Sequence, residues 1–174
     1  MSKTALAVLA FAVVLLFSVP MSAQLIPHGN VFAGVSYGQM SDVTNRASYR
    51  GWEGTAEFFP FARYSHLSFA LDGSGFYRND RYGSINQYNG MGAVRWSWSF
   101  GKFRPFLEGI GGYQRVNSSG IIYTHPVYGG GGGVDYKLPF KNFSWRFQGD
   151  YMRASYSSAI ENDYRASTGI VWRF

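Results

Sequence analysis

Charged and large apolar side chains alternate along most of the chain, and this alternation constrains the fold more than any other feature of the sequence. The last segment shows it best: Arg165 and Arg173 fall on one parity, whereas Tyr164, Trp172 and Phe174 fall on the other. Successive side chains of a β-strand point to opposite faces, so the pattern predicts a strand with one polar and one apolar face. A strand of this length can cross a bilayer when tilted, and aromatic residues near both ends are typical of membrane barrels.

The same alternation divides the chain after residue 23 into eight candidate strands, and no segment there shows sustained helical periodicity. Longer polar connections follow the first, third, fifth and seventh candidates, whereas tight turns follow the second, fourth and sixth. Long loops at one rim and short turns at the other are typical of up-and-down outer-membrane barrels. We therefore predict an all-β, eight-stranded antiparallel transmembrane β-barrel, with strands at about 30–39, 50–59, 66–77, 86–99, 103–114, 124–137, 143–154 and 163–174.

The positions of the charges fix which parity faces inward. An Arg or Lys on the lipid face costs about 2–4 kcal/mol at the bilayer midplane, so the charged parity should line the lumen. The opposite parity carries Trp, Phe, Tyr, Leu and Val, whereas the outer face of a soluble sandwich would be polar. We expect the lumen to contain Glu53, Glu57, Asp72, Arg95, Glu108, Asp135, Arg146, Asp150, Arg165 and Arg173.

Outward aromatic residues are expected to form two belts at the level of the lipid headgroups. Many outward positions between the belts are glycines, including Gly73, Gly75, Gly90 and Gly109, and we expect neighbouring rings to cover them. The short-turn belt would contain Phe58, Trp98, Tyr136, Trp145, Trp172 and Phe174, and the long-loop belt Tyr37, Trp52, Tyr77, Tyr113, Tyr128, Tyr151 and Tyr164.

The N-terminal segment has the features of a Sec-type signal peptide. Lys3 precedes an apolar run from Ala5 to Phe17, and small residues follow up to Ala23. The run is too short for a transmembrane helix. We predict a signal peptide over residues 1–23 and a single barrel domain over residues 24–174. Because the chain contains no Cys, neither disulfides nor thiolate metal sites are expected.

Four segments give the chain a resemblance to the small OmpA/OmpX-type outer-membrane β-barrel family: VFAGVSY (31–37), GGGVDY (131–136), FQGDY (147–151) and STGIVWRF (167–174). The resemblance covers the barrel domain only, without the peptidoglycan-binding domain of OmpA proteins. It implies a bacterial outer-membrane location, contact with outer-membrane lipid, and recognition of Trp172 and Phe174 by the barrel-assembly machinery. A monomer is expected.

The charged lumen favours a structural role over a role in transport. An eight-stranded barrel has an interior just wide enough for its side chains to fill. The six acids and four bases of the lumen should therefore pair, because unpaired buried charge is costly. A narrow channel for ions or small solutes is the alternative. A secreted lipocalin-like carrier would require an apolar lumen, which this pattern does not predict.

The sequence offers one enzymatic lead, the pair His66 and Ser68 with Glu57 as a possible orienting carboxylate. Lipid A deacylases of the outer membrane are similar in carrying a His-x-Ser pair and a Glu on an eight-stranded barrel. Here His66 adjoins a short turn, on the rim away from the outer leaflet, so we expect no enzymatic activity. The histidines lack metal-ligand spacing, and no Lys-Ser/Thr follows the glycine run 129–133, so neither a metal nor a nucleotide cofactor is predicted.

Basic residues near the long loops suggest a lipid partner. The chain carries a formal net charge of +6, but an exported protein does not ordinarily meet nucleic acid, so membrane phosphates are the expected counterpart. Arginine suits bidentate contact with phosphate. Together these features predict a structural or adhesive surface protein. Lipopolysaccharide contacts are expected from Arg46, Arg50, Arg78, Arg81, Arg115 and Arg153.

Overall fold

Eight antiparallel strands make up the fold in the computed structural model, which describes residues 28–41, 46–60, 66–80, 83–118, 121–155 and 160–174. The predicted signal peptide, residues 1–23, lies outside the described residues. No helix in the described part of the chain is long and apolar enough to cross a membrane. The strands are β1 (Gly29–Ser41), β2 (Arg46–Phe58), β3 (Leu67–Asp80), β4 (Gly83–Ser97), β5 (Phe103–Ser118), β6 (Ile121–Lys137), β7 (Phe143–Ser155) and β8 (Ile160–Arg173).

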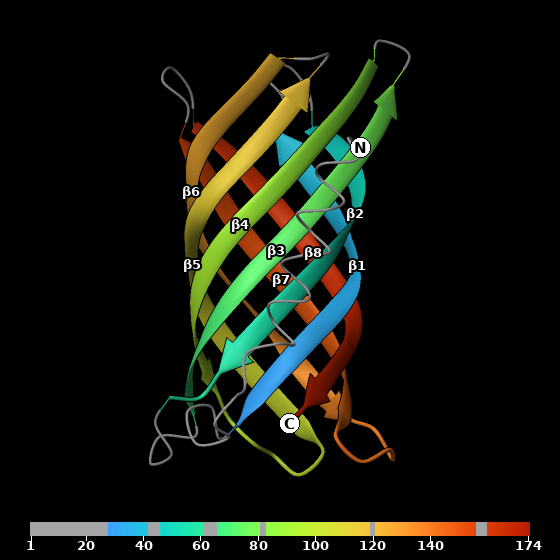
Figure 1. Cartoon of the computed structure of the whole chain (residues 1–174), viewed down its shortest axis with the longest axis vertical. Helices are drawn as coiled ribbons and strands as arrows, with labels where there is room; N and C mark the ends of the chain where they lie inside the picture. The colour runs from blue at the N-terminus through green and yellow to red at the C-terminus, as the bar shows by residue number, and fades with distance from the viewer. Residues whose placement is uncertain (1–27, 42–45, 61–65, 81–82, 119–120, 156–159) are drawn as a thin grey trace, which may run out of the picture.

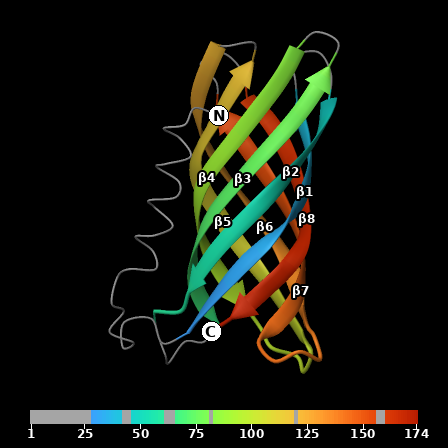
Figure 2. The same ribbon diagram turned by 45° about the vertical axis from the view of Figure 1, so that its right-hand side comes forward.

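The strands form one closed barrel in sequence order, which confirms the predicted fold (Figures 1 and 2). The first strand pairs with the last from Asn30 opposite Arg173 to Gln39 opposite Tyr164. Beyond this ladder, Gly29 and Phe174 exchange two backbone hydrogen bonds of 3.2 and 3.0 Å. Because closure pairs the first strand with the last, no sheet edge remains exposed.

The two rims differ from the prediction. The terminal rim carries both ends of the barrel and the connections 59–66, 98–102 and 138–142, whereas the hairpin rim carries 42–45, 81–82, 119–120 and 156–159. The prediction of long loops at the hairpin rim is wrong, because the ladders continue to Asp80 opposite Gly83 and to Ser118 opposite Ile121. Strands with two solvated faces carry polar residues on both parities, so alternation gives no signal there.

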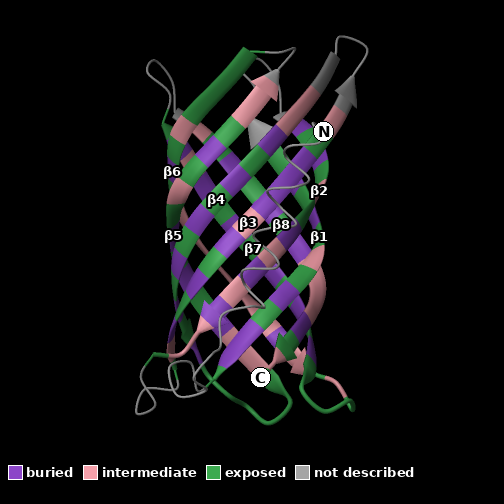
Figure 3. Ribbon diagram, viewed as in Figure 1, coloured by how far each residue is buried: buried purple, intermediate pink, exposed green. Residues whose placement is uncertain are grey.

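Burial alternates along the strands as predicted (Figure 3). Large apolar side chains stand on the outer wall, where Val35, Leu71 and Leu107 are 66%, 64% and 60% exposed. Between the two aromatic belts, no charged side chain of the described residues faces outward. The expected covering of outward glycines is found at Gly75, whose Cβ position would lie 2.7 Å from Trp52 Nε1, but nothing lies within 4 Å at Gly73, Gly90 or Gly109.

The interior is filled by diagonal rows of side chains that follow the ladders. One row is apolar and passes from Ala70 to Ala93 and Ile110 on β3 to β5, and then past Gly129 of β6 to Met152 on β7. The next row carries charge, with Arg95 opposite Glu108 and Asp150 opposite Arg165. The registers of the β4–β5, β6–β7 and β7–β8 hairpins therefore place an inward base opposite an inward acid on the next strand.

Glycine is required at one inward position of this charged row. A Cβ on Gly131 would collide with the Asp150 carboxylate and would lie 2.6 Å from the Gly149 carbonyl oxygen. Gly131 thus leaves room for the carboxylate that pairs with Arg165.

We expect Gly131→Ala to lower the temperature at which the folded barrel denatures, because both the backbone and Asp150 must shift. Gly109→Ala is the matched control on the adjacent strand, since its Cβ would meet nothing within 4 Å. Thermal unfolding followed by circular dichroism measures both variants. Equal melting temperatures would contradict the inferred crowding at Gly131.

Candidate functional site

The lumen contains two groups of paired charges. The first, here called the terminal cluster, consists of Glu57, Arg95, Glu108, Asp135, Arg146 and Arg173 and lies toward the terminal rim. Arg95 binds Glu57 through Nη1 at 3.1 Å and Glu108 through Nη2 at 2.7 Å. Ser68 donates a hydrogen bond of 2.7 Å from Oγ to the other Glu57 oxygen. The cluster thus joins four neighbouring strands, β2 to β5, through carboxylates that are almost completely buried.

Arg146 closes the terminal cluster across the lumen. Its Nε and Nη2 atoms bind the two Asp135 oxygens at 2.6 and 3.0 Å, and Nη2 also reaches Glu57 on the opposite wall at 3.4 Å. The guanidinium carbon lies 4.8 Å from the centre of the Phe106 ring, a cation–π distance. Three acids and three bases balance one another in this cluster.

The second group, the central cluster, is formed by Arg165 with Glu53, Asp72 and Asp150. Arg165 Nη1 lies 2.8 Å from Asp72, and Nε lies 2.8 Å from Asp150 and 3.5 Å from Glu53. Ser167 also donates a short hydrogen bond to Glu53. Three carboxylates therefore surround one guanidinium, and the positive charge of Arg165 is essential to their burial.

The structure brings the predicted lumen residues together. All of them are buried except Arg173, which lies at the terminal rim with 30% of its side chain exposed and binds Asp135 at 3.2 Å. Sequence reasoning missed further inward charges near the strand ends, among them Asp163 and Arg104. Asp163 is buried and accepts a 3.4 Å hydrogen bond from Gln114. Arg104 donates a hydrogen bond of 2.7 Å from Nη2 to Ser97 Oγ. Both fall on the inward parity of their strands, which is the signal that could have identified them.

His66 and Ser68 do not form a nucleophile–base pair. Ser68 points into the lumen and binds Glu57, whereas the exposed His66 ring stacks on Trp96 at a centroid distance of 6.2 Å. His66 Nδ1 lies 2.8 Å from the Ser97 carbonyl oxygen. The described residues contain no group of His, Cys, Asp and Glu that could hold a metal ion. The glycine run 129–133 lies within strand β6 and not in a loop before a helix.

The predicted lipid-contacting arginines divide between the two faces of the hairpin rim. Arg50, Arg115 and Arg153 lie on the outward parity, opposite tyrosines of neighbouring strands. Arg78 lies on the inward parity instead, with its guanidinium carbon 5.8 Å from the centre of the buried Tyr49 ring. Arg81 and the Arg46 side chain are outside the described part of the structure.

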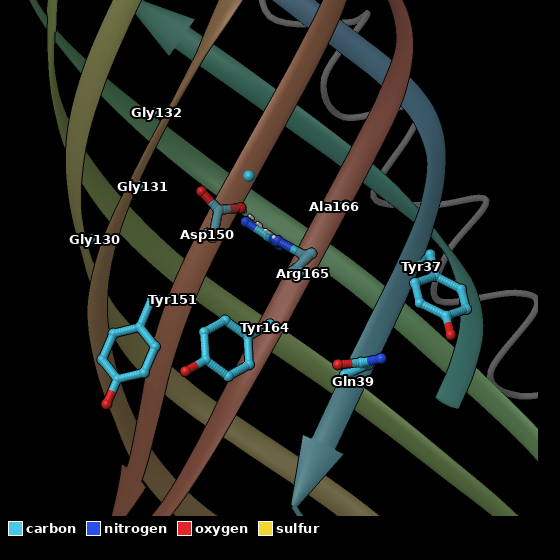
Figure 4. A pocket seen from close by; sticks show the side chains of 11 residues that line it. Tyr37, Gln39, Gly130, Gly131, Gly132, Asp150, Tyr151, Tyr164, Arg165 and Ala166 are labelled. Atoms are coloured by element: carbon cyan, nitrogen blue, oxygen red, sulfur yellow. Dashed lines mark hydrogen bonds and ion pairs between the residues drawn. The ribbon is translucent and has the colours of Figure 1, made fainter. Parts of the chain in front are cut away.

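The outer wall is hollowed over β6, β7, β8 and β1 (Figure 4). Gly130, Gly132, Gly149 and Ala166 line a depression of about 490 Å³, which Tyr37, Tyr151 and Tyr164 border. A second hollow of about 530 Å³ continues it past Val35, Phe147 and Thr168. Asp150 and Arg165 also line this depression, and Figure 4 shows them paired with each other, although both residues are buried.

Three solved structures with a similar fold are small outer-membrane barrels. No protein-family model and no curated protein sequence matches the chain. Neisserial surface protein A is 15% identical, with a TM-score of 0.69, over 84% of this chain and 97% of that one. Ail, the attachment invasion locus protein of Yersinia pestis, is 11% identical with a TM-score of 0.53, covering 84% of this chain and 98% of its own. The N-terminal β-barrel domain of Pseudomonas aeruginosa OprF is 14% identical with a TM-score of 0.55. This match covers 82% of this chain and 97% of the OprF domain. The chain therefore has the eight-stranded fold of small OmpA/OmpX-type outer-membrane barrels.

Proposed function

We propose that the protein is an integral outer-membrane barrel with a closed lumen, and that its hairpin rim serves as a surface for structural or adhesive contacts. The observation that carries this proposal is the inverted polarity of the barrel. Its charges are buried inside, and its outer wall between the belts is apolar. Such a wall would be unstable in water but matches the hydrocarbon core of a bilayer.

The outward arginines of the hairpin rim support a contact with lipopolysaccharide. Arg50 lies between Tyr37 and Tyr77 in the ladders, Arg115 lies opposite Tyr88, and no carboxylate among the described residues lies on the outward parity of this rim. Tyrosines favour the headgroup level, and guanidinium groups bind phosphate oxygens in pairs. The combination suits the phosphate groups of the outer leaflet.

The tip of the β5–β6 hairpin supports an adhesive role. Ile121, Ile122 and Tyr123 are 58%, 50% and 49% exposed at the hairpin rim, beyond the aromatic belt of the outer wall. Apolar side chains that are grouped and exposed to water commonly mark an interaction site. Among the similar structures, Ail bears the name attachment invasion locus protein and has been solved with the heparin analogue sucrose octasulfate. We propose that the hairpin rim of this protein contacts an external surface.

The closed lumen disfavours the alternative of a channel. Arg146 and Arg165 reach carboxylates on the far walls of the barrel, so the paired side chains cross the lumen at two levels. In planar bilayers the purified barrel should show no steady single-channel conductance. A reproducible open state would overturn the proposed closed lumen, whereas recovery of the protein in soluble fractions would overturn the membrane location.

Placing a charge on the outer wall should destabilise the inserted barrel. We expect Leu71→Arg to lower the free energy of unfolding from lipid by about 2–4 kcal/mol, because the guanidinium would face hydrocarbon. Ile122→Arg at the hairpin tip is the control and should change it little. Equilibrium unfolding in urea from lipid vesicles measures both. Similar stability of the two variants would contradict a lipid-facing position for Leu71.

Removing the single base of the central cluster should also be costly. Arg165→Met leaves Glu53, Asp72 and Asp150 without their shared partner, so we expect a loss of about 3–5 kcal/mol in the same unfolding measurement. The exposed Arg50→Met is the matched control and should have an effect below about 1 kcal/mol. Adding Asp72→Asn and Asp150→Asn to Arg165→Met should restore part of the loss. Wild-type stability of Arg165→Met would show that the cluster is not a structural requirement.

A further inference from the structure

A basic pocket at the terminal rim is separate from the lumen clusters and from the hairpin rim. It has a volume of about 280 Å³ and opens at the end of the lumen beside the β6–β7 turn. Its lining comes from the last residue of β6, the turn, the start of β7 and the end of β8. The lining residues are Lys137, Lys141, Asn142, Phe143, Ser144 and Arg173.

Backbone contacts hold the three bases of this pocket near one another. Lys137 lies opposite Ser144 in the β6–β7 ladder. Asn142 has a φ angle of 70°, which turns the chain so that its carbonyl oxygen accepts a 2.9 Å hydrogen bond from the Arg173 N–H. This bond ties the end of β8 to the turn that carries Lys141. The pocket is therefore part of the sheet and its tight turn, not of a long loop.

Two polar groups of the pocket have no hydrogen-bond partner. Ser144 is only 1% exposed, and its hydroxyl oxygen is buried without a partner. Arg173 donates a hydrogen bond from Nη2 to Asp135, but its buried Nε–H has no hydrogen-bond partner. Buried polar groups in native structures are nearly always satisfied, so each of these groups can accept a partner from outside the protein, such as a water or an oxygen atom of a ligand.

The charges of the pocket determine the kind of partner. Lys137 and Lys141 are exposed, and no ion pair links either to a carboxylate of the described residues. Asp135, the acid bound to Arg173, is also held by both nitrogens of Arg146 and belongs to the terminal cluster. The pocket is thus lined by two exposed lysines, and the unpaired Arg173 Nε–H and Ser144 hydroxyl lie in its buried wall. An anion with several oxygen acceptors satisfies all of them.

We infer that this pocket binds a phosphate group, and that its source is the headgroup of an anionic phospholipid. Arginine and lysine both bind phosphate oxygens, and the pocket is wide enough to admit the phosphate with part of the glycerol attached to it. Phe143 and Trp172 form an outward cross-strand pair beside the pocket, and the turn residue Phe140 is 70% exposed. These rings provide an apolar surface for the acyl chains. The lipid source rests on the proposed membrane location, whereas phosphate binding rests on the pocket alone.

The test compares lipid retention by wild type and by the Lys137→Gln/Lys141→Gln variant in native mass spectrometry. Both lysines are exposed, so the variant should fold. Lys102→Gln is the control, since Lys102 lies on the same rim but its side chain does not line the pocket. We expect wild type and the control to retain phosphatidylglycerol in preference to phosphatidylcholine. The double variant should bind phosphatidylglycerol at least about tenfold more weakly than wild type. Ser144→Ala should weaken binding to a smaller extent.

Titration with inorganic phosphate, followed by calorimetry, distinguishes the two sources of the anion. Binding of inorganic phosphate without a preference for phosphatidylglycerol would overturn the lipid assignment. Equal binding of either ligand by wild type and the double variant, or no binding at all, would overturn the site. Heat-modifiable migration of the same samples on a gel separates these results from a failure of the proposed membrane barrel. A sample that migrates as a folded barrel and binds no phosphate contradicts only the pocket.

Discussion

The pairing of charges inside the barrel is the interaction on which the rest of the structure depends. A carboxylate or guanidinium in a lumen that excludes water must meet an opposite charge, because its desolvation is otherwise uncompensated. The ladders provide first partners by placing Arg95 opposite Glu108 and Asp135 opposite Arg146. A slip of one residue in any of these registers would turn charges toward the outer wall. Charge pairing therefore favours the observed register over registers that are shifted by one residue, and this register allows the eight strands to close into a barrel.

Contacts across the lumen then add a constraint that neighbouring strands cannot supply. Arg165 on β8 binds Asp72 on β3, and Arg146 on β7 reaches Glu57 on β2. These contacts join walls that are distant along the sheet, so they favour one diameter and one relative tilt of the strands. They also support the proposed closed lumen. Any role of the protein is therefore expected at its outer wall and rims, where the hairpin rim carries Arg and Tyr and the terminal rim carries Lys and Trp.

The sequence predicts the barrel well where one face is apolar and the other is not. The inward parity of Glu53, Asp72 and Arg146 could be predicted because a charge on the outer wall is excluded by its cost. The prediction fails beyond the belts, where both faces are polar and alternation does not distinguish strands from loops. Arg78 was misplaced for that reason. The cross-lumen partners were not predictable, since they depend on the tilt of the closed sheet. The basic pocket joins positions 137, 144 and 173, which become neighbours only when the strands pair.

The central claim is that the outward parity faces lipid, and the native tryptophans measure it directly. Trp52, Trp96, Trp98, Trp145 and Trp172 are all outward and partly exposed, and they account for every tryptophan in the chain. In proteoliposomes, brominated acyl chains should quench most of the tryptophan fluorescence, whereas aqueous iodide should quench little of it. Strong quenching by iodide with none by brominated lipid would show that the outer wall faces water, and would contradict the account.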